Sequence, residues 1–161
     1  MIIRPALQTD LPAIRHIYAS ARQFMAKNGN PDQWGDTYPS EEIIQNDLHQ
    51  GHLFVCEAEQ EVAGVFCYFV GIEPDYLDIY EGSWLQDGSY GVVHRLAAGG
   101  KGRGIASHCL QYAFAQCGNL RIDTHRNNIP MQRLLAKTGF HRCGIIHCSH
   151  GGDRIAYQKT V

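Results

Sequence analysis

The residues best suited to binding chemistry form the glycine-rich turn Lys101-Gly102-Arg103-Gly104-Ile105-Ala106. The turn follows an apolar run at 90–98 and precedes a segment at 107–117 whose apolar residues recur with helical spacing. Glycines on either side of an arginine let the backbone approach a bulky anion, because no Cβ is in the way. A helix that begins there directs unpaired N–H groups and the positive end of its dipole to the same point. We therefore expect this turn to bind phosphate.

Taken alone, the turn must be compared with three other interpretations. A dinucleotide fingerprint needs the turn after a first strand and an acidic residue about twenty positions downstream, and Asp123 stands near that distance. The turn comes late in the chain, however, and a single β-α-β unit is too little for a full dinucleotide fold. The Walker pattern fails, because no Gly-Lys-Ser/Thr follows at the required spacing. A turn that only connects a strand to a helix stays an alternative.

The segments that must position this turn show the periodicities of strands and helices. Apolar runs predict about seven strands, at 2–4, 53–57, 62–70, 90–98, 119–124, 140–147 and 154–159. Capping residues and helical spacing predict helices from Thr9 or Asp10, from Ser40 to about Gln50, over 105–117, and from Asn127 or Asn128 to Gly139. The alternation in the second half requires a parallel strand pair with a crossover helix. We therefore expect an α/β (mixed α+β) fold, with helices on both faces of a mixed central sheet, in a single domain over 1–161.

Composition limits the classes of protein to which the chain can belong. Its 161 residues are 44% hydrophobic and 19% charged, which is typical of a globular chain with a sizeable core. The formal net charge of -2 gives no support for nucleic-acid binding, because such domains are usually distinctly basic. No apolar run reaches membrane length, and the start is too short for a signal peptide. We expect a cytoplasmic protein whose partners include neither nucleic acid nor membrane.

The six cysteines include no C-x-x-C pair and mostly lie in apolar segments. We interpret them as reduced, buried small hydrophobes. The alternative is a metal site among C-terminal residues with ligating side chains: His141, Cys143, His147, Cys148 and His150. The first three share one face of a strand by period-two counting, but the spacing matches no standard zinc pattern. We therefore expect no metal site.

Two motifs resemble the GNAT N-acetyltransferase superfamily. The glycine-rich turn is similar to its acyl-CoA signature, Arg/Gln-x-x-Gly-x-Gly/Ala, with Lys101 in the basic first position and Gly104 and Ala106 in the small ones. The segment 128–140 is similar to the next GNAT segment, in which an asparagine-capped helix ends in Gly-Phe. Both motifs occur at the right separation, and the whole chain can be laid along the GNAT order of elements. The resemblance implies a GNAT-like sheet with a splayed parallel strand pair.

The sequence departs from the GNAT pattern at two positions. Lys101 replaces arginine or glutamine and would attract phosphate as a point charge rather than as a planar fork. Leu135 stands where related enzymes often carry a tyrosine that protonates the departing thiolate. That acid is absent here, so the thiolate must be protonated by another group or by water, or must leave without a protein acid.

The resemblance also implies how acetyl-CoA, the acyl donor, would bind. It would lie where the 90–98 strand splays from the 119–124 strand, with its pantetheine arm on backbone groups near Leu96 and Ala98. The pyrophosphate would sit on the backbone N–H groups of the turn, with added charge from its basic side chains; the residues concerned are Lys101, Gly102, Arg103, Gly104, Ile105 and Ala106. Asn128 would cap its helix and also touch the pantetheine arm, although capping alone is an equal alternative. The acceptor amine would attack the thioester directly, and a backbone N–H, that of Leu96, would stabilise the oxyanion.

An alkyl ammonium must lose a proton before it attacks, and four residues are candidates for the base: His94, Glu81, His125 and Asp123. His94 lies on the motif strand two residues before Leu96, and its alternative is a hydrogen-bonded core histidine. Asp123 and His125 end the neighbouring strand, at the edge where α/β sheets bind ligands, although surface pairing is an equal reading. Glu81 lies in an irregular stretch, and its alternative is a solvated loop carboxylate, the usual state of an acid in such a loop. We rank His94 first, then Glu81 and His125.

The acceptor is the least defined part of the prediction. The irregular stretch 71–88 carries Asp75, Asp78 and Glu81, whose charge would favour a cationic acceptor such as a small amine or a peptide N-terminus. Trp34, Tyr76, Tyr80 and Trp84 could grip an apolar part of it or could simply pack. Because Leu135 replaces the usual acid, a non-catalytic acyl-CoA sensor is an alternative to an acetyltransferase. A metal-binding protein that uses the C-terminal histidines and cysteines is a third possible function. Antiparallel C-terminal strands can leave an edge for a homodimer, but nothing in the sequence demands one.

Overall fold

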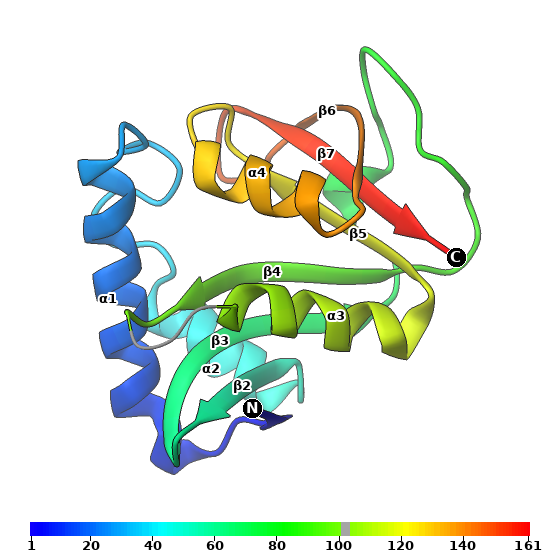
Figure 1. The fold of residues 1–161 in the computed structure, drawn as a ribbon. Helices are drawn as coiled ribbons and strands as arrows, with labels where there is room; N and C mark the ends of the chain where they lie inside the picture. The colour runs from blue at the N-terminus through cyan, green and yellow to red at the C-terminus, as the bar shows by residue number, and fades with distance from the viewer. Residues whose placement is uncertain (101–103) are drawn as a thin grey trace.

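One mixed β-sheet forms the centre of the molecule and carries helices on both faces (Figure 1). The computed structural model describes residues 1–100 and 104–161. The strands are β1 (Ile2–Pro5), β2 (Leu53–Ala58), β3 (Glu61–Val70), β4 (Gly91–Ala98), β5 (Asn119–Thr124), β6 (His141–His147) and β7 (Asp153–Thr160). The helices are α1 (Leu11–Lys27), α2 (Glu41–His49), α3 (Ile105–Cys117) and α4 (Ile129–Lys137), with short 3₁₀ turns at Gln8–Asp10 and Pro74–Tyr76. The predicted fold class is confirmed, and each expected strand and helix is present to within a few residues at its ends.

The sheet has the order β1-β2-β3-β4-β5-β7-β6, and β4–β5 is its parallel pair within the described residues. Helix α3 connects these two strands, as a parallel connection requires. The register joins them at only two positions, Gly91 with Leu120 and Val92 with Arg121. On its other side β5 pairs with β7 along its whole length. Beyond Val92 the two parallel strands therefore separate, and the predicted splay is present.

A bulge in β4 lies beside the splay. Cys67 of β3 is opposite His94, whereas Val65 is opposite Ala97, so β4 holds one extra residue over this interval. Arg95 takes up the excess with a φ of 53°, a left-handed conformation that costs energy for a non-glycine residue. The Tyr18 hydroxyl of α1 donates a hydrogen bond of 2.9 Å to the Arg95 carbonyl. Packing of α1 therefore holds the bulge in place.

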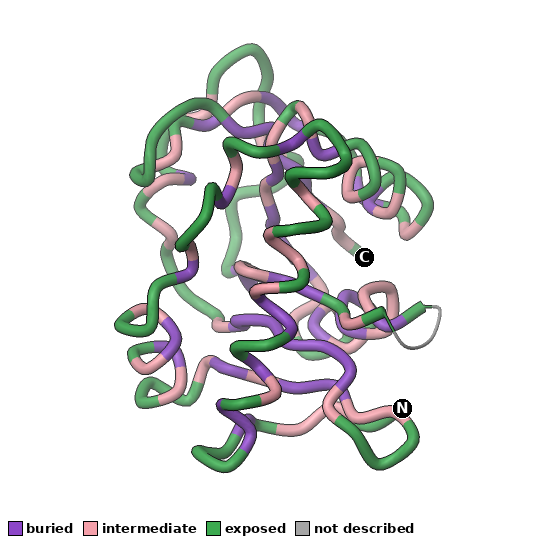
Figure 2. Tube along the Cα trace, turned by 90° about the vertical axis from the view of Figure 1, so that its left-hand side faces the viewer, coloured by how far each residue is buried: buried purple, intermediate pink, exposed green. Residues whose placement is uncertain are grey.

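Three apolar clusters cover the sheet. Side chains of α3 and Leu135 of α4 pack on one face. The opposite face carries α1 and α2 over its first strands, and the loop between β3 and β4 over its last ones. Figure 2 shows buried backbone through the middle of the molecule, with exposed backbone at the outer turns and loops. In the described part of the chain, no helix is both long and apolar enough to span a membrane.

Capping follows the sequence prediction at two of three helices. The Ser40 hydroxyl accepts a hydrogen bond from the Ile43 N–H, and the Asn128 side chain accepts one from the Met131 N–H. The expected side-chain cap at α1 is wrong, because the Asp10 carboxylate makes no cap bond there. It accepts instead from the Leu7 N–H and pairs with Arg4, which lowers its pKa by hydrogen bonding. The Asp10 side chain therefore pairs with Arg4 and does not cap α1.

The loop from 71 to 90 is docked on the far edge of the sheet. Tyr80 exchanges two backbone hydrogen bonds of 2.8 Å with Ile145 of β6, the edge strand. Gly82 lies so close to β6 that a Cβ on it would come within 1.9 Å of the Cys143 carbonyl oxygen. This contact covers part of the strand edge that was considered for a homodimer.

Replacing Gly82 by alanine will loosen this docking. The added methyl group must displace a backbone carbonyl, so we expect a loss of about 1–3 kcal/mol in the free energy of unfolding. Urea denaturation followed by circular dichroism measures it. Gly88→Ala in the same loop is the control, because its Cβ would meet nothing closer than the Gln86 amide at 4.0 Å. Equal stability of the two variants would show that the loop does not press on β6.

Candidate active site

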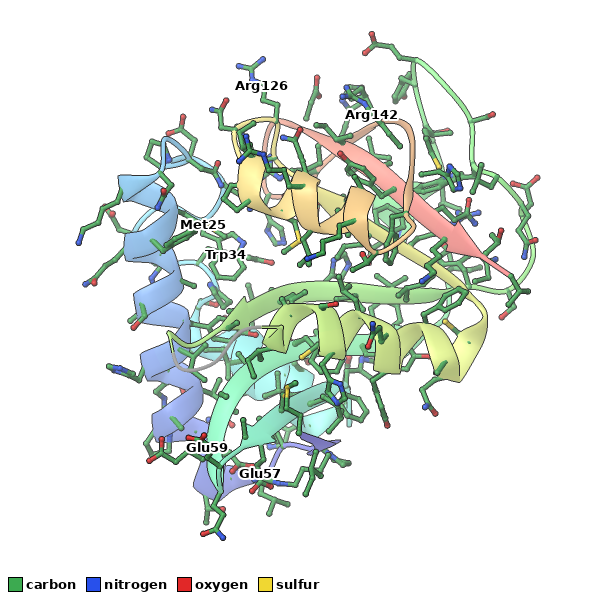
Figure 3. The ribbon with its side chains drawn as sticks, in the orientation of Figure 1. Met25, Trp34, Glu57, Glu59, Arg126 and Arg142 are labelled. Carbon is green, nitrogen blue, oxygen red and sulfur yellow. The ribbon has the colours of Figure 1, made fainter. Side chains whose placement is uncertain are left out.

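Two cavities meet at the splay between β4 and β5. The first, here called the polar cavity, has a volume of about 330 Å³ and is lined by β4, β5, the segment before α2, the 73–75 turn and the β6–β7 hairpin. The second, here called the apolar groove, has a volume of about 480 Å³ and is lined by α1, the end of β4 and the first turns of α3 and α4. Among the described residues, four line both cavities: Met25, Leu96, Asn128 and Met131. Figure 3 shows Met25 and Trp34 beside α1, between that helix and α4.

His94 and Glu73 form an ion-pair-like contact inside the polar cavity. The His94 Nε2 lies 3.0 Å from the Glu73 Oε2, and the two side chains are only 20% and 16% exposed. Burial raises the pKa of Glu73, but the hydrogen bond with His94 and its charge act the other way, and the net pKa is lowered. An ionised carboxylate only accepts hydrogen bonds, so the Nε2 atom of His94 is the donor in this contact. The Nδ1 atom is then the one that can accept another proton.

Asp123 is held beside His94 by Tyr76. The Tyr76 hydroxyl donates a 2.6 Å hydrogen bond to the Asp123 Oδ2, and the Tyr76 ring lies 6.0 Å from the His94 ring, centroid to centroid. Burial, together with the Asp123 charge, raises the pKa of Tyr76 well above its ordinary value, so the phenol keeps its proton. Asp123 itself lines the polar cavity. The structure therefore brings two of the four candidate bases to one place.

The other two candidates lie elsewhere. Glu81 is exposed and lines neither cavity. His125 also lines neither; its Nδ1 accepts a hydrogen bond from the Asn127 N–H, and burial with the Arg154 and Arg126 charges lowers its pKa. Of the expected acidic rim, Asp75 lines the polar cavity, whereas Asp78 is exposed and outside it. The path of the 71–90 loop, which the sequence does not reveal, accounts for the positions of Glu81, Asp75 and Asp78.

Glu73 is the residue of this site that the sequence reasoning missed. It belongs to the irregular stretch whose acids were considered, but its partner His94 is twenty-one positions away. Two hydrogen bonds hold Glu73 at the start of the 3₁₀ turn Pro74–Tyr76: its N–H donates to the Tyr90 hydroxyl, and its Oε1 accepts from the Asp75 N–H. An acid directly before a proline-started turn is the only signal in the sequence, and it is a weak one.

A buried ion pair supports the bulge under the site. Arg95 makes two hydrogen bonds of 2.8 Å to the Asp47 carboxylate of α2, and these side chains are 13% and 6% exposed. Its Nη1 also donates to the Tyr38 hydroxyl. Burial lowers the pKa of Arg95, but the hydrogen bonds and charges around the guanidinium outweigh this effect. The net pKa is raised, so the guanidinium stays charged. The hydrogen bonds of the Arg95 side chain therefore also help to hold its strained backbone in place.

The junction of the cavities contains the predicted cofactor-binding strand. Leu96 lines both cavities and Ala98 lines the groove, as does Ala106 at the start of α3. The β3–β4 register gives Leu96 no partner beside the bulge, and β5 has already separated from β4 beyond Val92. Gly104 starts α3 with a φ of 83°, and Ile105 is buried beneath it. Lys101, Gly102 and Arg103 lie outside the described residues.

Asn128 and Leu135 differ in what they can contact. Asn128 uses both ends of its amide, because its oxygen caps α4 and its Nδ2 donates to the Gln33 Oε1 at 3.0 Å. Capping is thus confirmed, and the residue also lines both cavities. Leu135 is the fully buried residue of α4 and lines neither cavity.

The thiols in the polar cavity are unsuited to nucleophilic attack. Cys67 and Cys148 line it, and burial raises both pKa values, that of Cys67 to about 12. A thiol with a raised pKa is mostly protonated at neutral pH and reacts slowly. At the C-terminal hairpin, His147 pairs with Asp153, and the described residues contain no group of three or more histidines, cysteines or acids placed to hold a metal ion.

The mixed sheet with a splayed parallel pair is the arrangement that the sequence resemblance implies, and the comparison with family models tests that resemblance. The model of the Acetyltransferase (GNAT) family matches residues 11–140. The chain belongs to the GNAT acetyltransferase family, and acyl transfer is the chemistry of that family. The resemblance seen in the two motifs is thereby confirmed.

Solved structures agree with this assignment. A GNAT-family acetyltransferase from Streptococcus agalactiae 2603 is 34% identical, with a TM-score of 0.91 over 99% of this chain and 95% of that one. The ribosomal-protein-alanine N-acetyltransferase from Brucella melitensis shares the fold at 20% identity and a TM-score of 0.66, over the whole of both chains. A chain of the NatC complex bound to Gag peptide and CoA shares it at 16% identity and a TM-score of 0.58, over 99% of this chain and 98% of that one. The search of curated proteins gave no match.

Proposed function

We propose that this protein transfers the acetyl group of acetyl-CoA to a primary amine, on a small molecule or a peptide N-terminus, by direct attack in a ternary complex. The observation that carries the proposal is the meeting of the apolar groove and the polar cavity at Leu96. A donor in the groove and an acceptor in the cavity would reach this point from opposite sides. No covalent enzyme intermediate is needed, since the two substrates meet directly.

The groove suits the donor. Its lining by Ala98, Ala106 and Leu134 fits the alkyl and amide arm of pantetheine, and the backbone of β4 at Leu96, where β5 has separated, would supply polar partners. The start of α3 at Gly104 directs N–H groups toward an anion, which supports a pyrophosphate on the glycine-rich turn. The NatC relative was solved with CoA bound, which is consistent with this use of the fold. Lys101 and Arg103 would add charge there.

The polar cavity suits an amine. His94 Nδ1 would accept the proton of the attacking ammonium, and the ionised Glu73 would stabilise the imidazolium that results. Asp123 would attract the ammonium electrostatically. The Leu96 N–H would donate a hydrogen bond to the tetrahedral oxyanion. The residues shared by the two cavities offer no acid, so water would relay to the departing thiolate the second proton, which the nitrogen loses as the amide forms.

A second candidate is a non-catalytic acyl-CoA sensor. The buried Leu135 favours it, because a tyrosine at this position is often the acid of related enzymes. A sensor would bind acetyl-CoA without turning it over.

Release of free thiol separates the two functions. Acetyl-CoA incubated with the protein and a panel of primary amines should yield thiol in proportion to protein, at a rate that saturates with amine. Mass spectrometry of the amine should show one added acetyl group. Binding of acetyl-CoA with no thiol release for any amine would identify a sensor instead.

A further inference from the structure

Arg154 is a buried cation in the polar cavity without an anionic partner. It lines the cavity and is only 6% exposed. Its guanidinium donates to three backbone carbonyls, those of Asp153 at 3.1 Å and of Gly151 and Gln33 at 3.4 Å each. Among the described residues no carboxylate lies within ion-pair distance of it, whereas Arg95, the other arginine of the cavity, is paired with Asp47. Buried charges are normally paired, so the absence of a partner points to a ligand.

The strand register places Arg154 in line with the acceptor machinery. His94 and Asp123 each lie two residues beyond the matched pair Val92 and Arg121, so they face the same side of the sheet at the same level. Asp123 is opposite Ala156 on β7, and Arg154 is two residues before Ala156, again on that side. A diagonal neighbour of this kind lies about 7–8 Å away. The row across the splay therefore consists of the His94 imidazole, the Asp123 carboxylate and the Arg154 guanidinium, in that order.

The Asp123 carboxylate does not neutralise Arg154. It accepts the Tyr76 hydroxyl instead, and no ion pair joins it to Arg154. The opposite charges are thus held apart on one wall, each facing the cavity with hydrogen-bonding capacity left. An ammonium beside Asp123 and an anion beside Arg154 would satisfy both.

We propose that the acceptor is a small amine that also carries a carboxylate, which Arg154 binds while the amine faces His94. This inference rests on the proposed function and narrows its acceptor. A guanidinium fork matches a carboxylate in two parallel hydrogen bonds. One singly charged anion fits the cavity better than a phosphate, because a phosphate carries more charge than the Arg154 guanidinium alone neutralises.

The first test uses the unmodified protein and matched amines. Amino acids, their carboxamides and the corresponding decarboxylated amines are compared by thiol release from acetyl-CoA. We expect kcat/KM to be roughly 10- to 100-fold higher for the free carboxylate, because the unpaired guanidinium must otherwise stay desolvated. Equal or faster turnover of carboxamides or polyamines would overturn the inference and leave the acetyltransferase intact. Absence of turnover for every amine would instead contradict the proposed function.

Variants of Arg154 separate recognition from structural support. Arg154→Met should abolish the preference for carboxylate over carboxamide by raising the KM of the carboxylate alone, and Arg154→Lys should keep part of it. Arg126→Met is the control, since Arg126 is exposed and points outward from the β5–α4 loop (Figure 3). A purely structural arginine would lower turnover of both amines equally, and that result would overturn the inference. If Arg154→Met fails to fold, the lysine variant and the wild-type comparison still decide.

Discussion

Replacing His94 by alanine should lower kcat for acetyl transfer by roughly 10²- to 10⁴-fold, the usual range for removing a general base. The ring is the titratable group at the junction that is held by an ionised carboxylate, so its loss leaves the ammonium without a proton acceptor. The dissociation constant for acetyl-CoA should stay near its wild-type value, because the groove is lined without His94. Steady-state rates at saturating amine and calorimetry of donor binding measure the two quantities.

Glu73→Gln tests the partner of this base. The amide keeps the shape and an acceptor oxygen but loses the negative charge, so we expect a smaller loss of kcat than for His94→Ala. Glu81→Ala and His125→Ala are controls for the remaining sequence candidates, and both should retain wild-type turnover because neither side chain lines a cavity. Wild-type turnover of His94→Ala, or a large loss in Glu81→Ala, would show that the wrong base has been chosen.

Replacing Asp47 by alanine should cost about 3–5 kcal/mol in the free energy of unfolding, because it leaves the buried Arg95 charge without its partner. Chemical denaturation at neutral pH measures the loss. The bulge at β4 should relax at the same time, since Arg95 holds its strained φ of 53° partly through this pair. We therefore expect lower kcat even at temperatures where the variant is folded.

Glu41→Ala on the same helix is the matched control for Asp47. Glu41 pairs with Arg15 at 2.6 Å, but these side chains are 51% and 47% exposed. Exposed pairs are screened by water, so the loss should be a small fraction of that at Asp47. Similar stabilities for the two variants would mean that the Arg95 charge is solvated in the folded state.

The sequence predicts the sheet well because its evidence is local. Apolar runs and capping residues such as Ser40 and Asn128 identify elements without knowledge of what they pack against. The parallel β4–β5 pair follows from the helix between them. The two motifs then imply the splay, and the register confirms it.

The site is harder to predict because its residues meet through long-range packing. Glu73 reaches His94 only through the path of the 71–90 loop, and Arg154 becomes a cavity residue only through the β5–β7 register. The bulge at Arg95 depends on Asp47 and Tyr18 from two different helices. Glu81 was ranked as a base from its loop alone, and docking of that loop on β6 places it in solvent. None of these contacts can be inferred from the composition or from the spacing of residues in the sequence.

Calorimetric titration of acetyl-CoA into the wild-type chain is the most direct test of the claim that the splay and glycine-rich turn hold a thioester-bearing nucleotide. We expect saturable binding of one acetyl-CoA per chain, with a rise in melting temperature that grows with ligand concentration. His94→Ala should bind with the same stoichiometry, since it lies on the acceptor side. No heat and no thermal protection in the wild-type chain would contradict the donor site, and with it the acetyl transfer proposed for this protein.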